Sequence, residues 1–201
     1  MKVKTIINMF ILSLIFSGVL QAQYKVGDQV SDFKLKNVDN QYVSLSQFPS
    51  AQGFIIVFTC NTCPFAVKYE KRIDQLNKDF STQGYPVIAI SSNDVNIKPG
   101  DSFEEMQKKA KSEAYSYPYL FDESQEVASR FGATNTPHVF VVAKDGNQLV
   151  LKYIGAIDNN VDDPSKADKK YVAEAISSLK EGKDPSVSAT KAVGCGIKWK
   201  N

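Results

Sequence analysis

The segment from residue 53 to residue 91 constrains the fold more than any other part of the chain. Residues 53–59 form a nearly continuous apolar run, which predicts a central strand covered on both faces. After Cys63, apolar residues recur at spacings of four, four, three and four, which predicts an amphipathic helix. A second apolar run over 86–91 completes a β-α-β unit, whose crossover is almost always right-handed. The chain is therefore predicted to be an α/β protein with parallel strands in its sheet.

Further elements are predicted on both sides of this unit. Alternating apolar and polar residues around turn residues indicate hairpins, and Ser102 with Glu105 forms the pattern of a helix start. The predicted elements are a hairpin over 33–36 and 42–45, a helix from 103, a helix over 123–131, a hairpin over 138–143 and 148–154, and a closing helix over 171–179.

Composition places the chain among globular proteins. Hydrophobic residues make up 43% and charged residues 23%, which excludes extended disorder and multi-span membrane architectures. A net charge of +2 without a basic stripe argues against a nucleic-acid binder. A length of 201 residues favours one domain. We assign residues 1–22 to a signal peptide, 23–180 to the domain, and 181–201 to a tail that packs on it.

The N-terminus has the pattern of a secretory signal. Lys2 and Lys4 precede an apolar run over 6–20, and the run closes around Ala22. We expect cleavage near Ala22, export to the periplasm or another extracytoplasmic compartment, and no membrane span afterwards. The alternative is an uncleaved anchor, because the run is shorter than the roughly 20 residues of a span but would suffice if tilted.

Cys60 and Cys63 form a CxxC pair where the apolar strand ends and the amphipathic helix begins. The N–H groups and the positive end of a helix stabilise a thiolate, which predicts a cysteine pKa lowered from ~8.5 toward ~7. The two intervening residues let the second sulfur reach the first. Cys60 is therefore expected to attack a substrate disulfide and Cys63 to resolve the mixed disulfide. The alternatives are a static structural disulfide and a zinc site, for which few further ligands exist.

Four features outside this pair carry weaker signals. Pro137 follows Thr136 at the start of a predicted strand, where proline is either an edge device or part of a cis peptide. For Cys195, the third cysteine, we expect a packed residue of the tail, with a second resolving thiol or intermolecular pairing as alternatives. His138, the single histidine, is expected to be exposed or partly packed. Residues 158–163 resemble half of a calcium loop, for which a solvated turn is expected.

One set of motifs spans residues 25–199. It consists of FTCNTCP at 58–64, SSND at 91–94, YLFD at 119–122, Thr136-Pro137, and GCGIKW at 194–199. The set resembles the thioredoxin superfamily, and more narrowly the exported redoxins related to alkyl hydroperoxide reductase and thiol-specific antioxidant (AhpC/TSA) proteins, in a peroxiredoxin-like branch with a thioredoxin-type CxxC.

The resemblance implies a thioredoxin-like fold, with a central mixed β-sheet flanked by helices and an N-terminal hairpin extension. It implies that Pro137 is cis beside Cys60 and Cys63, and that the backbone at Thr136 binds an extended substrate segment. It also supports Cys60 as the attacking thiol and Cys63 as the resolving thiol of a redox-active disulfide.

Several positions depart from the patterns of these families. Thr59 and Phe54 stand where typical thioredoxins have a tryptophan and a buried aspartate, so proton handling cannot be transferred. If Cys63 is aligned with the peroxidatic cysteine of peroxiredoxins, Cys60 and Ile56 replace the hydroxyl residue and the proline of their motif. Half of the peroxide-activating motif is therefore absent.

The sequence predicts an exported oxidoreductase that cycles the Cys60–Cys63 pair between dithiol and disulfide. It would act in redox homeostasis or disulfide reduction without a bound cofactor. Its expected partners are protein thiols and disulfides, with an upstream thiol donor or acceptor. One alternative is a thiol-dependent peroxidase with antioxidant activity. The other is a Cu(I) metallochaperone using Cys60, Cys63 and His138, since soft sulfur and imidazole ligands suit Cu(I).

Overall fold

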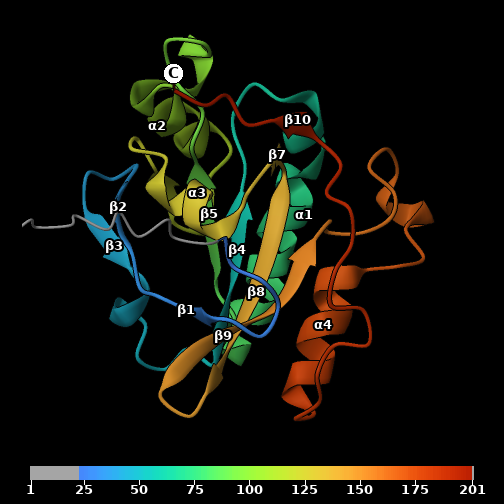
Figure 1. Ribbon diagram of the computed structural model, residues 1–201. Coiled ribbons are helices and arrows are strands. Elements are labelled where there is room, and N and C mark those ends of the chain that lie inside the picture. The colour runs from blue at the N-terminus through green and yellow to red at the C-terminus, as the bar shows by residue number, and fades with distance from the viewer. Residues whose placement is uncertain (1–22, 201) are drawn as a thin grey trace, which may run out of the picture.

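The computed structural model describes residues 23–200, which form a mixed sheet with helices on both faces (Figure 1). Eight strands lie in the order β1-β9-β8-β4-β5-β6-β2-β3. They are β1 (Gln29–Val30), β2 (Lys34–Asn37), β3 (Tyr42–Ser44), β4 (Gly53–Phe58), β5 (Val87–Ser91), β6 (Tyr119–Phe121), β8 (His138–Asp145) and β9 (Gln148–Gly155). The pairs β4–β5 and β5–β6 are parallel and the others are antiparallel.

Helices cover both faces of this sheet. They are α1 (Pro64–Phe80), α2 (Phe103–Ser112), α3 (Glu126–Phe131) and α4 (Tyr171–Lys180). Because strand side chains alternate, Ile55 and Val57 of β4 pack with α1, α2 and α4. Phe54, Ile56 and Phe58 point to the opposite face and pack with α3 and the N-terminal segment. Both faces of β4 are thus buried, as its continuous apolar sequence predicts.

The tail returns to the sheet after α4. Its main chain first bonds β9, where the Ile154 N–H donates to the Ser188 carbonyl at 3.0 Å and the Thr190 N–H to the Ile154 carbonyl at 2.9 Å. It then forms β10 (Cys195–Gly196), which pairs antiparallel with β7 (Asn135–Thr136) in a separate two-stranded sheet. Figure 1 shows this crossing beyond the ends of the central strands, near the start of α1.

The predicted elements and the structure agree over the central unit, both hairpins, α2 and α4. Helix α3 begins three residues later than predicted, because Gln125 adopts a left-handed conformation with φ of 63°. The sequence interpretation missed β1, β6, β7 and β10, which are two or three residues long. No helix within residues 23–200 is long and apolar enough to cross a membrane. The predicted signal or anchor lies outside the described residues.

The expected solvated turn over 158–163 is wrong at its first residue. Asp158 is buried, and the Arg72 guanidinium donates to both of its carboxylate oxygens at 2.9 and 2.7 Å. The Tyr69 hydroxyl donates to the same carboxylate at 2.9 Å. Two further bonds from Arg72 to the carbonyls of Asn160 and Val161 attach this loop to α1.

Candidate active site

The CxxC pair lies at the carboxyl end of β4 and the N-terminus of α1, as the sequence predicts. Cys63 is the N-cap residue of α1 with an extended backbone, and Pro64 occupies the first helical turn, where its missing N–H costs little. Each of the two cysteines is 3% exposed. The site is therefore a closed junction between strand and helix, with both sulfurs inside it.

Thr136 lies against both cysteines. Its hydroxyl shares a hydrogen bond with the Cys60 Sγ at 3.3 Å, and its carbonyl oxygen lies 3.1 Å from the Cys63 Sγ. The Thr136–Pro137 peptide bond is cis, which confirms that expectation. The motif thus meets the cysteines from a segment more than 70 residues away in the chain.

The disulfide in the structure joins Cys63 to Cys195, and Cys60 is a free thiol. The oxidised pair therefore differs from the expected Cys60–Cys63 disulfide, and the expectation that Cys195 is simply packed is wrong. The physical reason is the register of β10, which places Cys195 opposite Thr136. There its backbone N–H reaches the Cys63 Sγ at 3.4 Å, and the two Cα atoms are 6.0 Å apart. The catalytic roles of Cys60 and Cys63 stay predictions.

Gly194 lets the tail approach this closely. A Cβ at this position would overlap the Thr136 carbonyl oxygen and lie 2.6 Å from its carbonyl carbon. On one side of Cys195, the Asn135 side chain donates to the Gly194 carbonyl at 2.9 Å. On the other side, the buried Ile197 donates its N–H to the Thr134 carbonyl at 3.0 Å. Cys195 is therefore held from both directions.

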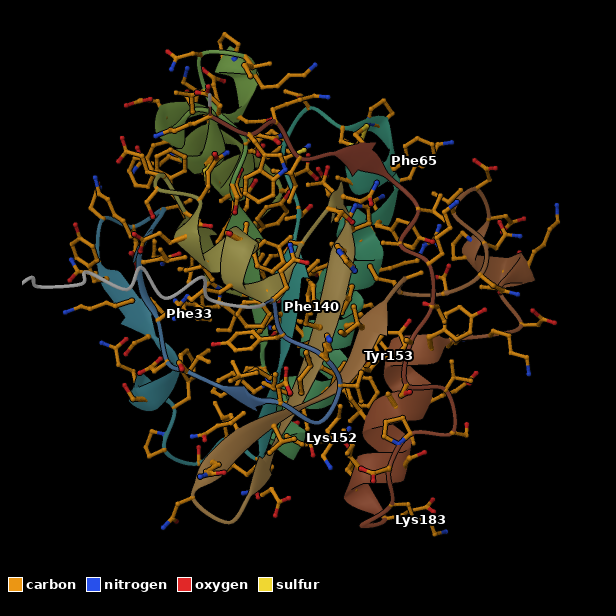
Figure 2. The ribbon with its side chains drawn as sticks, viewed as in Figure 1. Phe33, Phe65, Phe140, Lys152, Tyr153 and Lys183 are labelled. Carbon is orange, nitrogen blue, oxygen red and sulfur yellow. A yellow bond between two sulfur atoms is a disulfide. The ribbon has the colours of Figure 1, made fainter. Side chains whose placement is uncertain are left out.

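A side chain of α1 also covers the two sulfurs, together with the tail. Phe65 and Cys195 both pack on the small cluster formed by Cys60, Cys63 and Ala66. Figure 2 shows Phe65 at the end of α1 next to β10. The tail and the first turn of the helix together cover the cysteine motif.

A second buried group faces the motif from the loop before α2. Asp101 is fully buried, and its Oδ1 accepts hydrogen bonds from the backbone N–H groups of Asn61 at 2.9 Å and Thr62 at 3.0 Å. Its Oδ2 accepts from the Thr62 hydroxyl at 3.0 Å and the Asn93 amide at 2.7 Å. No sequence pattern marks Asp101, which lies about 40 residues beyond the motif.

The electrostatics of Cys60 differ from the expectation. Burial raises the pKa of the Cys60 thiol, and the nearby Asp101 carboxylate raises it further. The hydrogen bond to Thr136 and the backbone N–H groups of Cys63 and Thr62 lower the pKa but do not outweigh these effects. The predicted fall in pKa is therefore wrong, because the helix N-terminus acts on a sulfur that is removed from water.

His138 does not join the cysteines. It is 7% exposed, its Nδ1 accepts the Thr134 N–H at 3.2 Å, and its ring lies 4.6 Å from that of Phe140. Burial lowers the pKa of His138 to about 4, so the imidazole is neutral at pH 7. Within residues 23–200, no three histidine, cysteine or acidic side chains are grouped to hold a metal ion. The copper set of Cys60, Cys63 and His138 is therefore not formed.

Comparison with known proteins places these features in a family. Residues 26–148, well over half of the chain, match the AhpC/TSA family. The chain belongs to the AhpC/TSA family. This stretch contains the cysteine motif, Asp101 and Thr136, whereas Cys195 and the strand that carries it lie beyond it.

Relatives agree with this assignment. The structure superimposes on that of an uncharacterized conserved protein from Geobacillus kaustophilus with a TM-score of 0.80 and 33% identity, over 89% of this chain and 94% of the other. It superimposes on an exposed lipoprotein thioredoxin of Streptococcus pneumoniae with a TM-score of 0.50 and 21% identity, over 60% and 87%. The thiol-disulfide oxidoreductase ResA of Halalkalibacterium halodurans is 19% identical over 66% of this chain and 70% of its own length. The predicted thioredoxin-like fold is confirmed.

Proposed function

We propose that this AhpC/TSA family member is an exported thiol–disulfide oxidoreductase in which Cys60 attacks the disulfide of a substrate. The observation that carries the proposal is a free thiol, Cys60, beside a Cys63–Cys195 disulfide, with Thr136 in contact with both sites. The similarity to a protein named as a thiol-disulfide oxidoreductase supports it. Export is supported by the basic and apolar pattern of the N-terminus.

The reaction begins with the reduced protein. The Cys60 thiolate attacks one sulfur of the substrate disulfide, and the other sulfur leaves as a thiolate that takes up a proton. Cys63 then attacks Cys60 in the mixed disulfide, which forms a Cys60–Cys63 disulfide and releases the second substrate thiol. Two electrons have passed from the protein to the substrate.

Cys195 completes the cycle in this scheme. Its thiolate attacks the Cys63 sulfur, the Cys60–Cys63 bond breaks, and Cys60 leaves as a thiolate. This exchange is redox-neutral and yields the Cys63–Cys195 disulfide seen in the structure. An upstream thiol donor must then supply two electrons to restore the reduced protein. Cys195 therefore acts as a second resolving thiol.

We expect a partner to dock in the way that the tail does. β10 pairs its backbone with β7 and presents Cys195 to the cysteine motif. An extended substrate segment that carries a disulfide would use the same edge of β7, as strand addition commonly does. The substrate class is therefore a cysteine in an extended polypeptide segment, which binds when the tail is away from β7.

The test is to follow reduction of a peptide that carries a mixed disulfide with a fluorescent thiol. We expect Cys60→Ala to abolish the reaction and Cys63→Ser to accumulate a covalent adduct on Cys60. Cys195→Ser should complete one turnover and end with a Cys60–Cys63 disulfide, identified by peptide mass. Full activity of Cys60→Ala would overturn the proposal.

A separate measurement distinguishes the peroxidase alternative. Half of the peroxide-activating motif is absent, since Cys60 and Ile56 stand in place of its hydroxyl residue and its proline. We expect the reduced protein to consume hydrogen peroxide no faster than an equal concentration of dithiothreitol. Faster, Cys60-dependent consumption would favour the peroxidase over the disulfide reductase.

A further inference from the structure

Asp101 is a buried acid without a cationic partner. None of the ion pairs formed within residues 23–200 includes it. Its two oxygens instead accept four hydrogen bonds, two of them from backbone N–H groups inside the cysteine motif. A group that only accepts hydrogen bonds is suited to the ionised form of a carboxyl. A negative charge therefore lies against the Asn61-Thr62 turn.

The motif is held to this loop by further contacts. The Asn61 side chain donates to the Gly100 carbonyl at 3.0 Å and accepts from the Tyr119 hydroxyl at 3.0 Å. The Asn61-Thr62 turn thus bonds to the Asp101 loop through both of its residues. Such a network places the two cysteines relative to each other before any substrate binds.

Asp101 lies next to Cys60 through the backbone of the motif. Its Oδ1 accepts from the N–H groups of Asn61 and Thr62, the two residues that follow Cys60 in the chain. A carboxylate bound at this position is a negative charge close to the Cys60 sulfur. It therefore disfavours a second negative charge on that sulfur.

We propose that Asp101 is a positioning residue, which holds the Asn61-Thr62 turn next to Cys60 and places a negative charge there that disfavours the Cys60 thiolate. The inference rests on the proposed function, in which Cys60 is the attacking thiol. Asp101 is a buried acid in the segment before α2, whereas Phe54 stands where typical thioredoxins have their aspartate. The attack of Cys60 is then slow at neutral pH and accelerates as pH rises.

The other groups around Cys60 carry no charge in the neutral range. Burial raises the pKa of Tyr119 well above its usual value, so its hydroxyl stays protonated. Cys63 and Cys195 are joined in a disulfide and do not titrate. Thr136 has no ionisable group, and His138 on β8 is neutral above its pKa of about 4. A titration of the Cys60 thiol between pH 6 and 10 therefore measures how the charge of Asp101 affects the Cys60 pKa.

The test uses the oxidised full chain, in which Cys60 is the free thiol, and follows thiolate absorbance in the ultraviolet against pH. Cys60→Ser provides the background, and the mass of the disulfide-linked peptides confirms the Cys63–Cys195 pair. Asp101→Asn removes the charge and keeps the shape, but replaces one acceptor oxygen with an NH2 donor. For this variant we expect a lower Cys60 pKa. The thiolate fraction at pH 7 should rise about tenfold for each unit by which the Cys60 pKa falls.

Thr62→Val is a comparison variant, in which the Cys60 pKa is not expected to fall as it does in Asp101→Asn. It removes one hydrogen bond to Asp101 but leaves the carboxylate, whose charge is then less well compensated. We expect the Cys60 pKa to stay the same or rise. A purely structural role of Asp101 would instead shift the Cys60 pKa in the same direction in both variants. That result, or an unchanged or higher pKa in folded Asp101→Asn, would overturn the inference. Should Asp101→Asn not fold, a lowered Cys60 pKa in Thr62→Val would overturn it alone.

The pH profile of disulfide reduction gives an independent measurement. The rate of reduced Asp101→Asn should reach half its maximum at lower pH than that of the wild type. If the wild type does not reduce the peptide disulfide at all, the proposed function fails. The titration of Cys60 still tests the influence of Asp101 in that case.

Discussion

Replacing Gly194 with alanine tests whether the tail determines which disulfide the protein holds. The new Cβ would overlap the Thr136 carbonyl oxygen and lie 2.6 Å from its carbonyl carbon and 3.0 Å from the Pro137 nitrogen. All three are backbone atoms, which cannot rotate away as a side chain can. The strand β10 must therefore lift from β7.

The magnitude follows from the contacts that β10 would lose. Burial of Ile197 is worth about 1.5–3 kcal/mol. The hydrogen bonds of Asn135 to Gly194 and of Ile197 to Thr134 are each worth about 1 kcal/mol net. A partial loss of about 3 kcal/mol would make the Cys63–Cys195 disulfide roughly 100-fold less favourable, or about 60 mV more oxidising for a two-electron couple.

The assay is equilibration in glutathione buffers, followed by alkylation and mass measurement of the peptide that contains Cys195. Gly196→Ala is a matched control in the same strand, because its Cβ would find its nearest neighbour, the Thr134 carbonyl oxygen, at 3.9 Å. We expect Gly196→Ala to keep the wild-type potential. An unchanged potential in Gly194→Ala, or an equal shift in both variants, would refute the reasoning.

Two further predictions concern stability. Arg72→Met leaves the buried Asp158 carboxylate without its cation, so unfolding in urea should show a loss of about 3–5 kcal/mol; Lys68→Met, which breaks an exposed ion pair, should cost less than about 1 kcal/mol, and equal losses would contradict the burial argument. For His138, the folded pKa of about 4 lies below the unfolded value, so the unfolded chain binds more protons as pH falls from 6.5 to 4 and stability decreases by up to roughly 3 kcal/mol. His138→Gln should lack this component, and a difference between wild type and variant that is the same at pH 7 and pH 4.5 would show that the histidine is not buried as a neutral ring.

The local sequence pattern was sufficient to predict the helices and strands that bury one or both of their faces. The apolar run of β4 and the helical spacing of apolar residues in α1 predict which of their faces are buried. The two patterns also place Cys60 and Cys63 at a strand-to-helix junction. The short strand β6 has three residues and no periodicity to detect. Its position follows from pairing with β5 and β2, which are distant in sequence.

The chemistry of the site was less predictable, because it depends on contacts over long distances in the chain. Cysteine spacing cannot decide disulfide connectivity, and the Cys63–Cys195 pair follows from the register of β10 on β7. The pKa of Cys60 was misjudged because the helix N-terminus is visible in the sequence, whereas burial and the charge of Asp101 are not. Asp101 itself precedes a helix cap and has no motif of its own.

Thr136 lies next to the cysteines of both the predicted pair and the observed pair. Its hydroxyl bonds the Cys60 sulfur, its carbonyl oxygen lies 3.1 Å from the Cys63 sulfur, and β10 places Cys195 opposite it. All three cysteines therefore meet at one residue of β7. In the proposed cycle, docking of β10 favours the Cys63–Cys195 disulfide with a free Cys60. A substrate segment on β7 instead meets the reduced protein with the tail away, and there Cys63 resolves the mixed disulfide on Cys60, the partner that the CxxC spacing predicts.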